Sequence, residues 1–264
     1  MTATFDKIAR NNLIKNFNHS DYVYEGTPIR EMVVRQIDSE LAREIISTFH
    51  YSKTYPDSTL YCYGGYLNGK LIGVICYGMG CGKNQYTSIY PKIENGSYLE
   101  LTRLWVANDM PRNSESKLIS TSLKMLPSQY KLIVSFADES KGHCGIIYQA
   151  TNWYYLGKNG GGKMIEKNGI TKHTRLLGIY KMRHPEYKDM TNDELMKLLG
   201  YHYVEGGKKH RYVYLRGNKK DRKNIYIYIK DKILPYPKID KKKGLSEQEI
   251  VDKEKPHYNQ IKLF

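Results

Sequence analysis

The sequence lacks a long apolar run, a secretory signal and a disulfide framework. Its longest apolar run extends from Leu71 to Cys76 and is interrupted by Gly73, whereas a transmembrane helix needs about 20 apolar residues. The segment Met1–Phe17 has no apolar core of the kind that secretory signals contain. Four cysteines in 264 residues are too few to staple a fold of this size. We therefore expect a reduced, cytoplasmic protein that has no membrane span.

Phenylalanine is scarce relative to tyrosine, and acidic residues are scarce relative to basic ones. The chain has 5 Phe against 25 Tyr, and 27 Asp and Glu against 42 Lys and Arg, which leaves a net charge of +15. Most of that excess, +11, falls between Gly206 and Lys243. A concentrated positive charge combined with many tyrosines is typical of a nucleic-acid partner. The alternative is that lysine and tyrosine reflect an A/T-rich genome.

Apolar periodicity predicts a mixed α/β fold with a hairpin-rich, mostly antiparallel sheet flanked by helices. The Asn68-Gly69 pair predicts a tight hairpin, Asp38 or Ser39 a helix cap, and Thr191–Glu194 a capping box. We expect strands at 29–34, 60–67, 70–77, 97–106, 131–136, 174–180, 211–216 and 224–229, and helices at 40–49 and 114–126, from about 144, and before Gly200.

The segment 99–126 reads as a strand, a polar loop and a helix. Such a helix start offers free backbone N–H groups to an anion, and hydroxyls there add donors. This order resembles the acyl-coenzyme A binding unit of GNAT acetyltransferases, although Glu115 stands where that family has glycine. The resemblance implies that a cofactor would meet Arg103, Arg112, Ser114 and Ser116. The alternative is an ordinary helix capped by Ser114.

A second segment, 145–157, resembles the GNAT helix that carries a tyrosine and is followed by a strand. In that family the tyrosine matching Tyr148 often protonates the leaving thiolate. The alternative is that Tyr148 is an aromatic side chain of the core.

Several short motifs occur in one order along residues 28–216. They are His50-Tyr51-Ser52-Lys53, Leu99–Leu104, Asn113–Lys117, Ser135–Asp138 with Gly142-His143, Ile147–Ala150 and Lys209–Tyr212. This series resembles the Mom family of bacteriophage DNA-modification proteins, which are GNAT-like. The resemblance implies an enzyme that converts adenine in duplex DNA to an N6-carbamoylmethyl derivative and so shields phage DNA from restriction, in the cytoplasm of an infected or lysogenic host. It places functional positions at His50, Tyr51, Arg103, Ser114 or Ser116, and Asp138.

These residue types suit that chemistry. Adenine N6 is a poor nucleophile because its lone pair is delocalised, so a base must lie within hydrogen-bond reach of it. Asp138, at the end of an apolar strand, is the candidate base, or else a helix cap. His50 and Tyr51 would supply a second base or a stacking face for a flipped adenine, although such a pair is usually structural. An internal Arg103 paired with Glu100 is the alternative to a cofactor ligand.

Flipping a base out of a duplex requires contacts to the DNA backbone. The predicted DNA-binding residues are Lys208, Lys209, Arg211, Arg216, Lys219, Lys220, Arg222 and Lys223. The alternative is a solvated charged face. We divide the chain into an N-terminal arm (1–27), a GNAT-like catalytic domain (28–216) and a basic C-terminal extension (217–264).

The sequence indicates the cofactor less closely than it indicates the fold. The spacings Cys76-x4-Cys81 and His143-Cys144 are not those of a zinc site, so we expect no structural metal, although the family resemblance suggests iron. The donor would be an acyl-coenzyme A or a glycine-derived carrier. Two other functions stay open: N-acetylation of a protein, tRNA or small amine by acetyl-coenzyme A, and non-catalytic DNA binding. Nothing in the sequence determines the oligomeric state.

Overall fold

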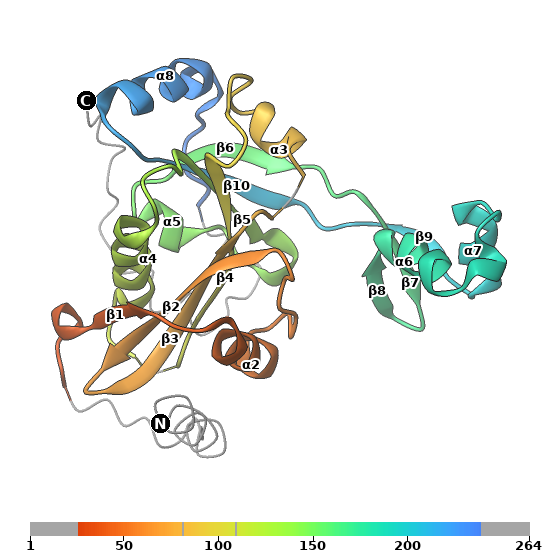
Figure 1. The fold of residues 1–264 in the computed structure, drawn as a ribbon, viewed down its shortest axis with the longest axis horizontal. Coiled ribbons are helices and arrows are strands. Elements are labelled where there is room, and N and C mark those ends of the chain that lie inside the picture. The colour runs from red at the N-terminus through yellow and green to blue at the C-terminus, as the bar shows by residue number, and fades with distance from the viewer. Residues whose placement is uncertain (1–25, 81, 109, 239–264) are drawn as a thin grey trace.

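The computed structural model describes residues 26–80, 82–108 and 110–238 (Figure 1). The predicted N-terminal arm therefore lies almost wholly outside the described residues, as does the predicted extension beyond residue 238. In the described part of the chain, no helix is long and apolar enough to cross a membrane.

The described residues form a seven-stranded sheet in the order β1-β2-β3-β4-β5-β10-β6. Its strands are β1 (Val33–Gln36), β2 (Thr59–Leu67), β3 (Lys70–Gly78), β4 (Tyr98–Val106), β5 (Leu132–Asp138), β6 (Tyr154–Asn159) and β10 (Lys209–Leu215). Strands β4 and β5 pair in parallel, and the other neighbours pair antiparallel. This confirms the predicted mixed, mostly antiparallel sheet.

Helices cover both faces of this sheet, because its central strands are apolar on both sides. Ile75 and Ile133 pack on one face with α4, whereas their neighbours Val74 and Val134 point to the other face, which α2 and α8 cover. The helices around the sheet are α2 (Ser39–Phe49), α3 (Asn84–Thr87), α4 (Ser114–Met125), α5 (Ile146–Gln149) and α8 (Lys219–Ile229), with 3₁₀ turns at Ile29–Glu31, Glu139–Lys141 and Lys230–Lys232.

Several local predictions are confirmed. Asn68 and Gly69 adopt φ of 50° and 75°, the left-handed conformations that a two-residue hairpin turn requires. Asp38 caps α2 by accepting a hydrogen bond from the Leu41 N–H at 2.8 Å. Thr191 and Glu194 form the predicted capping box.

Two predicted strands are wrong. Residues 175–180 lie in helix α6 (Arg175–Arg183), and Thr174 is its N-cap. The helix buries Leu177 in a small separate core with Ile165 and Leu195. Residues 224–229 lie in helix α8. The alternation of isoleucines there fits either structure, and the helix buries Ile225 and Ile229, four residues apart, while leaving Ile227 52% exposed.

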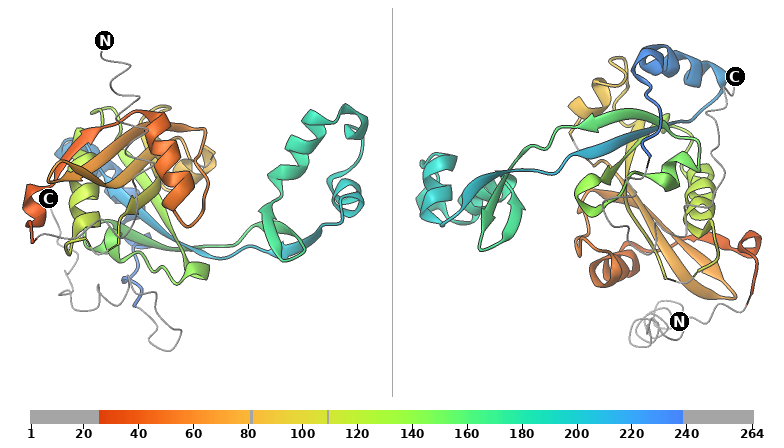
Figure 2. Two further views of the ribbon diagram at one scale, coloured as in Figure 1. Left: turned by 90° about the horizontal axis from the view of Figure 1, so that it is seen from below. Right: turned by 180° about the vertical axis from the view of Figure 1, so that it is seen from behind.

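A lobe is inserted between β6 and β10, and we call residues 160–208 the arm. All ribbon views show it projecting from the sheet on two crossing connections (Figures 1 and 2). It contains β7 (Lys163–Lys167), β8 (Ile170–His173), α6 (Arg175–Arg183), a 3₁₀ turn at Pro185–Tyr187, α7 (Asn192–Leu198) and β9 (His202–Glu205), with the strands in the order β8-β7-β9.

Candidate functional site

A pocket of about 360 Å³ opens where two parallel strands separate. Strands β4 and β5 are paired only from Tyr98 and Leu132 to Glu100 and Val134. Beyond that point they diverge, and the later residues of both strands line the pocket. The volume lies in the range of small-molecule sites, about 300–1,000 Å³. The fold therefore provides a cavity in the middle of the sheet.

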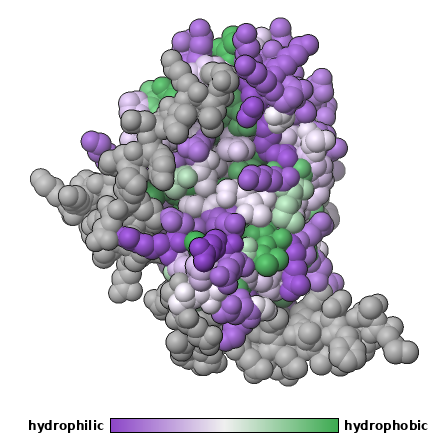
Figure 3. Space-filling model, turned by 90° about the vertical axis from the view of Figure 1, so that its left-hand side faces the viewer, coloured by the Kyte–Doolittle hydropathy of each residue, from purple (hydrophilic) through white to green (hydrophobic). Residues whose placement is uncertain are grey.

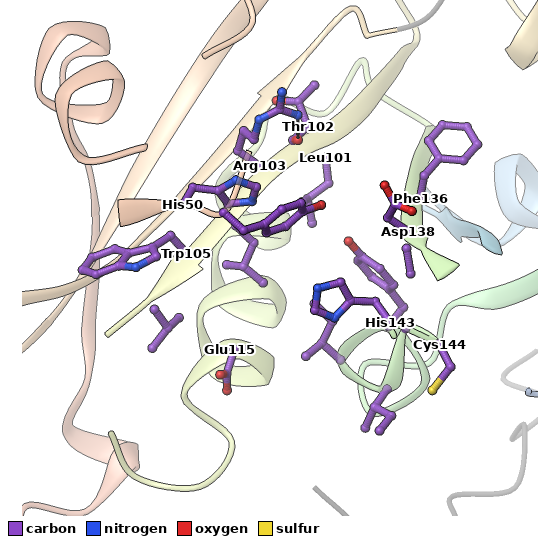
Figure 4. Close-up of a pocket in the computed structure, with 18 of the residues that line it drawn as sticks. His50, Leu101, Thr102, Arg103, Trp105, Glu115, Phe136, Asp138, His143 and Cys144 are labelled. Atoms are coloured by element: carbon purple, nitrogen blue, oxygen red, sulfur yellow. Dashed lines mark hydrogen bonds between the residues drawn. The ribbon is translucent and has the colours of Figure 1, made fainter. Parts of the chain in front are cut away.

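The pocket brings together five of the predicted site residues. They are His50, Tyr51, Arg103, Asp138 and Tyr148. Figure 4 shows Asp138 and His143 on one side of the cavity and His50 on the other. The residues come from four separate segments, so only the fold places them together. Their catalytic roles stay predictions.

Asp138 ends β5 and keeps one carboxylate oxygen for a ligand. Ser140 donates two hydrogen bonds to its Oδ1, from the backbone N–H at 3.0 Å and from Oγ at 2.7 Å. Asp138 thus also caps the 3₁₀ turn that follows, which was the alternative interpretation. Because both bonds reach Oδ1, Oδ2 is available to accept a proton in the pocket. The cap fixes the carboxylate and does not compete with that role.

His50 is a buried, neutral imidazole. Burial, and then the positive charge of Arg103, lower its pKa to about 4. The Ser52 backbone N–H donates to its Nδ1 at 3.1 Å, so this nitrogen carries no proton and the ring is protonated at Nε2. In this state His50 is a hydrogen-bond donor at Nε2, which argues against the predicted second base.

Tyr51 follows His50 and lies between two imidazole rings. Its ring centroid is 4.2 Å from that of His50 and 5.6 Å from that of His143. The residue is 56% exposed. Burial of the hydroxyl, and then the Asp138 charge, raise its pKa, so the phenol stays protonated at neutral pH. An exposed aromatic face at a pocket entrance can stack on a base.

Arg103 braces the loop that carries these residues. Its Nε donates to the Thr54 carbonyl at 2.8 Å and its Nη2 to Thr54 Oγ1 at 2.9 Å. Nη1 donates to the carbonyl of Thr102 at 2.6 Å. The guanidinium lies beside the pocket, but these bonds hold the loop after α2 in place. These bonds give Arg103 a positioning role beside the pocket, and its predicted contacts with a cofactor or with Glu100, whose charge acts on the guanidinium, stay predictions.

Tyr148 presents its hydroxyl at the base of the pocket. A hydrogen bond of 2.8 Å joins Tyr148 Oη to Ser135 Oγ. Burial strongly raises the pKa of this phenol. The ring also packs 5.1 Å from those of Trp153 and Tyr212, so Tyr148 belongs to the core and also lines the pocket. Its role as a proton donor stays a prediction.

The start of α4 does not fit the pyrophosphate of an acyl-coenzyme A. Ser114 is 1% exposed, and its Oγ donates to the Pro111 carbonyl at 2.6 Å, so its hydroxyl is used inside the fold. Arg112 and Ser116 do not line the pocket, whereas Glu115 does and brings a carboxylate to the first turn of the helix. A negative charge there opposes a bound anion.

Iron is not supported by the arrangement either. His50 and Asp138, the ligands that the resemblance suggests, line the pocket. Over the described residues, however, no group of three or more His, Cys, Asp or Glu side chains could hold a metal ion.

The predicted DNA-binding residues divide between the two ends of β10. Lys209 is exposed and pairs in register with Asp138, so it and Lys208 lie at the pocket end. Lys219, Lys220 and Lys223 are exposed on α8, at the opposite end. Seven strand residues, about 23 Å, separate the ends. Figure 3 shows a hydrophilic surface at the top of the molecule, where α8 lies.

The arginines of this set are largely used within the fold. Arg216 donates to the carbonyls of Leu126, Pro127 and Tyr130 at 2.7–3.0 Å and so caps the end of α4. Three of its five N–H donors are therefore engaged within the fold, which favours a structural role, and its predicted contact with DNA stays a prediction. Arg211 is half-buried and contacts Ser88 Oγ at 3.5 Å, and Arg222 is also half-buried.

Most of the residues that line the pocket had no role predicted from the sequence. Trp105, Glu115, Phe136 and His143 line the cavity without having been assigned a role. The Gly142-His143 pair was the available signal for the last of these. The others occupy strand or helix positions that look like ordinary structural residues.

Comparisons with known proteins agree with this picture. Over 143 residues the chain is 36% identical to methylcarbamoylase mom of Escherichia phage Mu. The matched region is 52% of this chain and 59% of the relative. The chain thus matches about three fifths of that relative's length.

Solved structures of similar shape are acetyltransferases. One is a GNAT family acetyltransferase from Elizabethkingia anophelis with acetyl-CoA bound, with a TM-score of 0.37 and 10% identity, covering 70% of this chain and 97% of that chain. Another is Arabidopsis thaliana NAA60 in complex with a bisubstrate analogue, with a TM-score of 0.44 and 12% identity, covering 70% and 97%. Residues 31–238, most of the sequence, match the model of the Mom protein family, and the chain belongs to that family.

Proposed function

We propose that this protein is a transferase that attaches a carbamoylmethyl group to N6 of adenine in duplex DNA, a modification that would protect phage DNA from restriction. Family membership and the relative named methylcarbamoylase support a transfer of this kind. The observation that carries the proposal is the pocket in which Asp138 faces the His50-Tyr51 pair.

Each residue then has one task. Oδ2 of Asp138 accepts the N6 proton as the new N–C bond forms, because a neutral exocyclic amine needs a base in contact with it. In the same step the bond between that carbon and the donor breaks, and the leaving atom takes the bonding electrons. Tyr51 stacks on the flipped adenine, which has lost its neighbours in the duplex. The Nε2–H of His50 and the phenol of Tyr148 are protonated donors for the group being transferred or for its leaving atom.

The transferred group is carbamoylmethyl, whichever molecule donates it. The geometry at the start of α4 argues against a pyrophosphate bound there, because the Ser114 hydroxyl is engaged within the fold and Glu115 adds a negative charge. A glycine-derived carrier has no such requirement. No step above depends on which donor is used.

The first experiment digests plasmid DNA to nucleosides after expression and analyses them by mass spectrometry. We expect a new adenine nucleoside with the intact chain. Asp138→Asn should lower its rate of formation by about 10²–10⁴ with an unchanged melting temperature. Asp231→Asn, an exposed carboxylate after α8, is the matched control and should behave like the parent.

The outcomes separate the alternative functions. Unmodified nucleosides together with tight DNA binding would support the non-catalytic DNA-binding protein. Acetylation of an amine by acetyl-coenzyme A, without a new nucleoside, would support the conventional acetyltransferase. An Asp138→Asn variant that modifies DNA at the parental rate would remove the base assigned here.

A further inference from the structure

The arm begins and ends beside the pocket. Asn159, where β6 ends, pairs in register with Lys209, where β10 begins, and Lys209 also pairs with Asp138 on its other side. The root of the arm is therefore two strands wide and directly adjacent to the proposed base. Whatever enters the pocket as part of a long polymer must pass the arm on this side.

The neck of the arm is built from glycine. Gly206 N–H donates to the Gly162 carbonyl at 3.0 Å. A Cβ on Gly161 would lie 1.6 Å from the Gly206 oxygen, so the two connections cross too closely for any other residue. Strand β8 returns antiparallel along β7, with His173 opposite Met164, so α6, which begins at Arg175, starts near the neck end of β7.

Charge within the arm is divided by sequence and not mixed. Residues 163–183 contain six Lys and Arg and one Glu, a net charge of +5. Residues 184–205 contain two Lys and five Asp and Glu, a net charge of −3. The basic half comprises β7, β8 and α6, whereas α7 and its flanks are acidic. Such a division gives the small lobe one surface suited to a polyanion.

Some of these cations are used inside the arm and others face solvent. Lys167 donates to the Leu199 carbonyl at 2.8 Å, and Lys163 lies 5.0 Å from the centre of the Tyr203 ring. Arg175 and Arg183, at the two ends of α6, are exposed, and so is Lys172 just before it.

The exposed face of α6 has an apolar centre. Ile179 is 38% exposed and Met182 84% exposed, and they follow Arg175 by four and seven residues, so all three share one face of the helix. Arginines contact phosphates, and apolar side chains such as Ile and Met pack into a groove or between base steps.

We propose that α6 of the arm contacts the phosphate backbone of duplex DNA on one side of the target adenine, through Arg175 and Arg183. This inference rests on the proposed function, because it takes the occupant of the pocket to be a base of that duplex. It adds a second contact outside the pocket, which holds the duplex in place while the pocket holds the flipped base.

The test compares two variants with the same change in total charge. Arg175→Gln with Arg183→Gln removes two cations from α6, and Lys188→Gln with Lys197→Gln removes two from the acidic half of the arm. Both pairs are exposed, and glutamine is a good helix former. Fluorescence anisotropy with a labelled duplex, read at several salt concentrations, measures affinity, and circular dichroism checks that each variant melts like the parent.

We expect the arginine variant to reduce the slope of log affinity against log salt by about 1.8, because each lost phosphate contact removes about 0.9. The lysine variant should leave the slope unchanged. Lengthening the duplex on one side of the target adenine should raise the affinity of the parent and not that of the arginine variant.

An unchanged slope in the arginine variant, or an equal change in both variants, overturns the inference even if the parent modifies adenine. If the parent makes no adenine product but the arginine variant binds DNA more weakly than the parent, the proposed chemistry is refuted and the arm contact stands. Binding of α6 to an acidic protein with no effect on DNA affinity would also overturn it.

Discussion

The body of the molecule and the arm are stabilised in different ways. The body buries large apolar and aromatic side chains on both faces of its sheet, from Tyr63 and Trp153 to Ile45. The arm has a small core of Ile165, Leu177, Leu195 and Met196. A unit of fewer than about 50 residues is marginal by itself. We therefore expect the arm to depend on its attachment to the body and the body to fold without the arm.

The two regions also divide the chemistry. All five predicted residues that line the pocket belong to the body. The arm contributes exposed cations and a surface that reaches away from the sheet (Figure 2). In this arrangement affinity for a long polymer can be changed separately from the reaction, and the following predictions test that separation.

The largest effect is expected from removing the arm. Because Asn159 and Lys209 are register partners, replacing 160–208 by Asn-Gly would join β6 and β10 as an ordinary hairpin. We expect a cooperative melt, a strong loss of DNA affinity at moderate salt, and adenine product still formed at low salt and high enzyme concentration. A chain that no longer melts cooperatively would show that the arm is part of the body's fold.

The next effect concerns α8, which lies in the predicted basic extension. Its Ile225 is 2% and its Ile229 0% exposed against β5 and β10. Each change to Ala should lower the free energy of unfolding by about 2–5 kcal/mol, measured by urea denaturation. Ile227→Ala, at a 52% exposed position, is the control and should change it by less than about 0.5 kcal/mol.

That comparison bears on the boundary predicted after residue 216, which stays a prediction. Large losses at Ile225 and Ile229 would place α8 within the folded body, and deletion of 217–264 would then unfold the protein. Small losses would support a separable extension whose lysines act on DNA alone.

A smaller effect distinguishes a structural arginine from a DNA-binding one. Arg216→Gln removes donors from the carbonyls at the end of α4 and should lower the free energy of unfolding by about 1–3 kcal/mol. Its salt slope for DNA binding should equal that of the parent. Lys209→Gln, beside Asp138, provides the contrast: its slope should fall by about 0.9 with little change in stability.

The sequence predicted the body better than the arm. Apolar runs on both sides of an Asn-Gly turn identify β2 and β3, and Asp38 identifies the start of α2, because these signals are local. Helix α6 was missed because the run around Leu177 has no strong period, and its packing against Leu195 decides its structure.

The sequence allowed some residues of the pocket to be predicted, but not the pocket itself. Short motifs identified His50 and Asp138, but the cavity between them arises where β4 and β5 stop pairing after Glu100 and Val134. No spacing in the sequence encodes that divergence. Sequence charge also could not show that Arg103 and Arg216 spend their donors on backbone carbonyls, since that depends on which loops lie beside them.

A further effect is the pH dependence of stability that His50 confers on the body. Its pKa is about 4 in the folded chain, against 6.5 for an ordinary histidine, because it is buried near the charges of Arg103, His143 and Lys53. Between these values the unfolded chain binds more protons, so the free energy of unfolding should fall as the pH falls from about 6.5 to about 4.

Urea denaturation across that range measures the effect, and His50→Gln should remove part of it. His210 is the internal comparison. Burial lowers its pKa too, and its Nδ1 lies 2.9 Å from Tyr155 Oη, beside the root of the arm. His210→Gln should therefore leave the His50 contribution in place, and the double variant should show the flattest profile. A His50→Gln profile that coincides with that of the parent would mean that the pKa of His50 is not lowered in the folded chain, and its proposed role as a buried, neutral Nε2–H donor would lose this support.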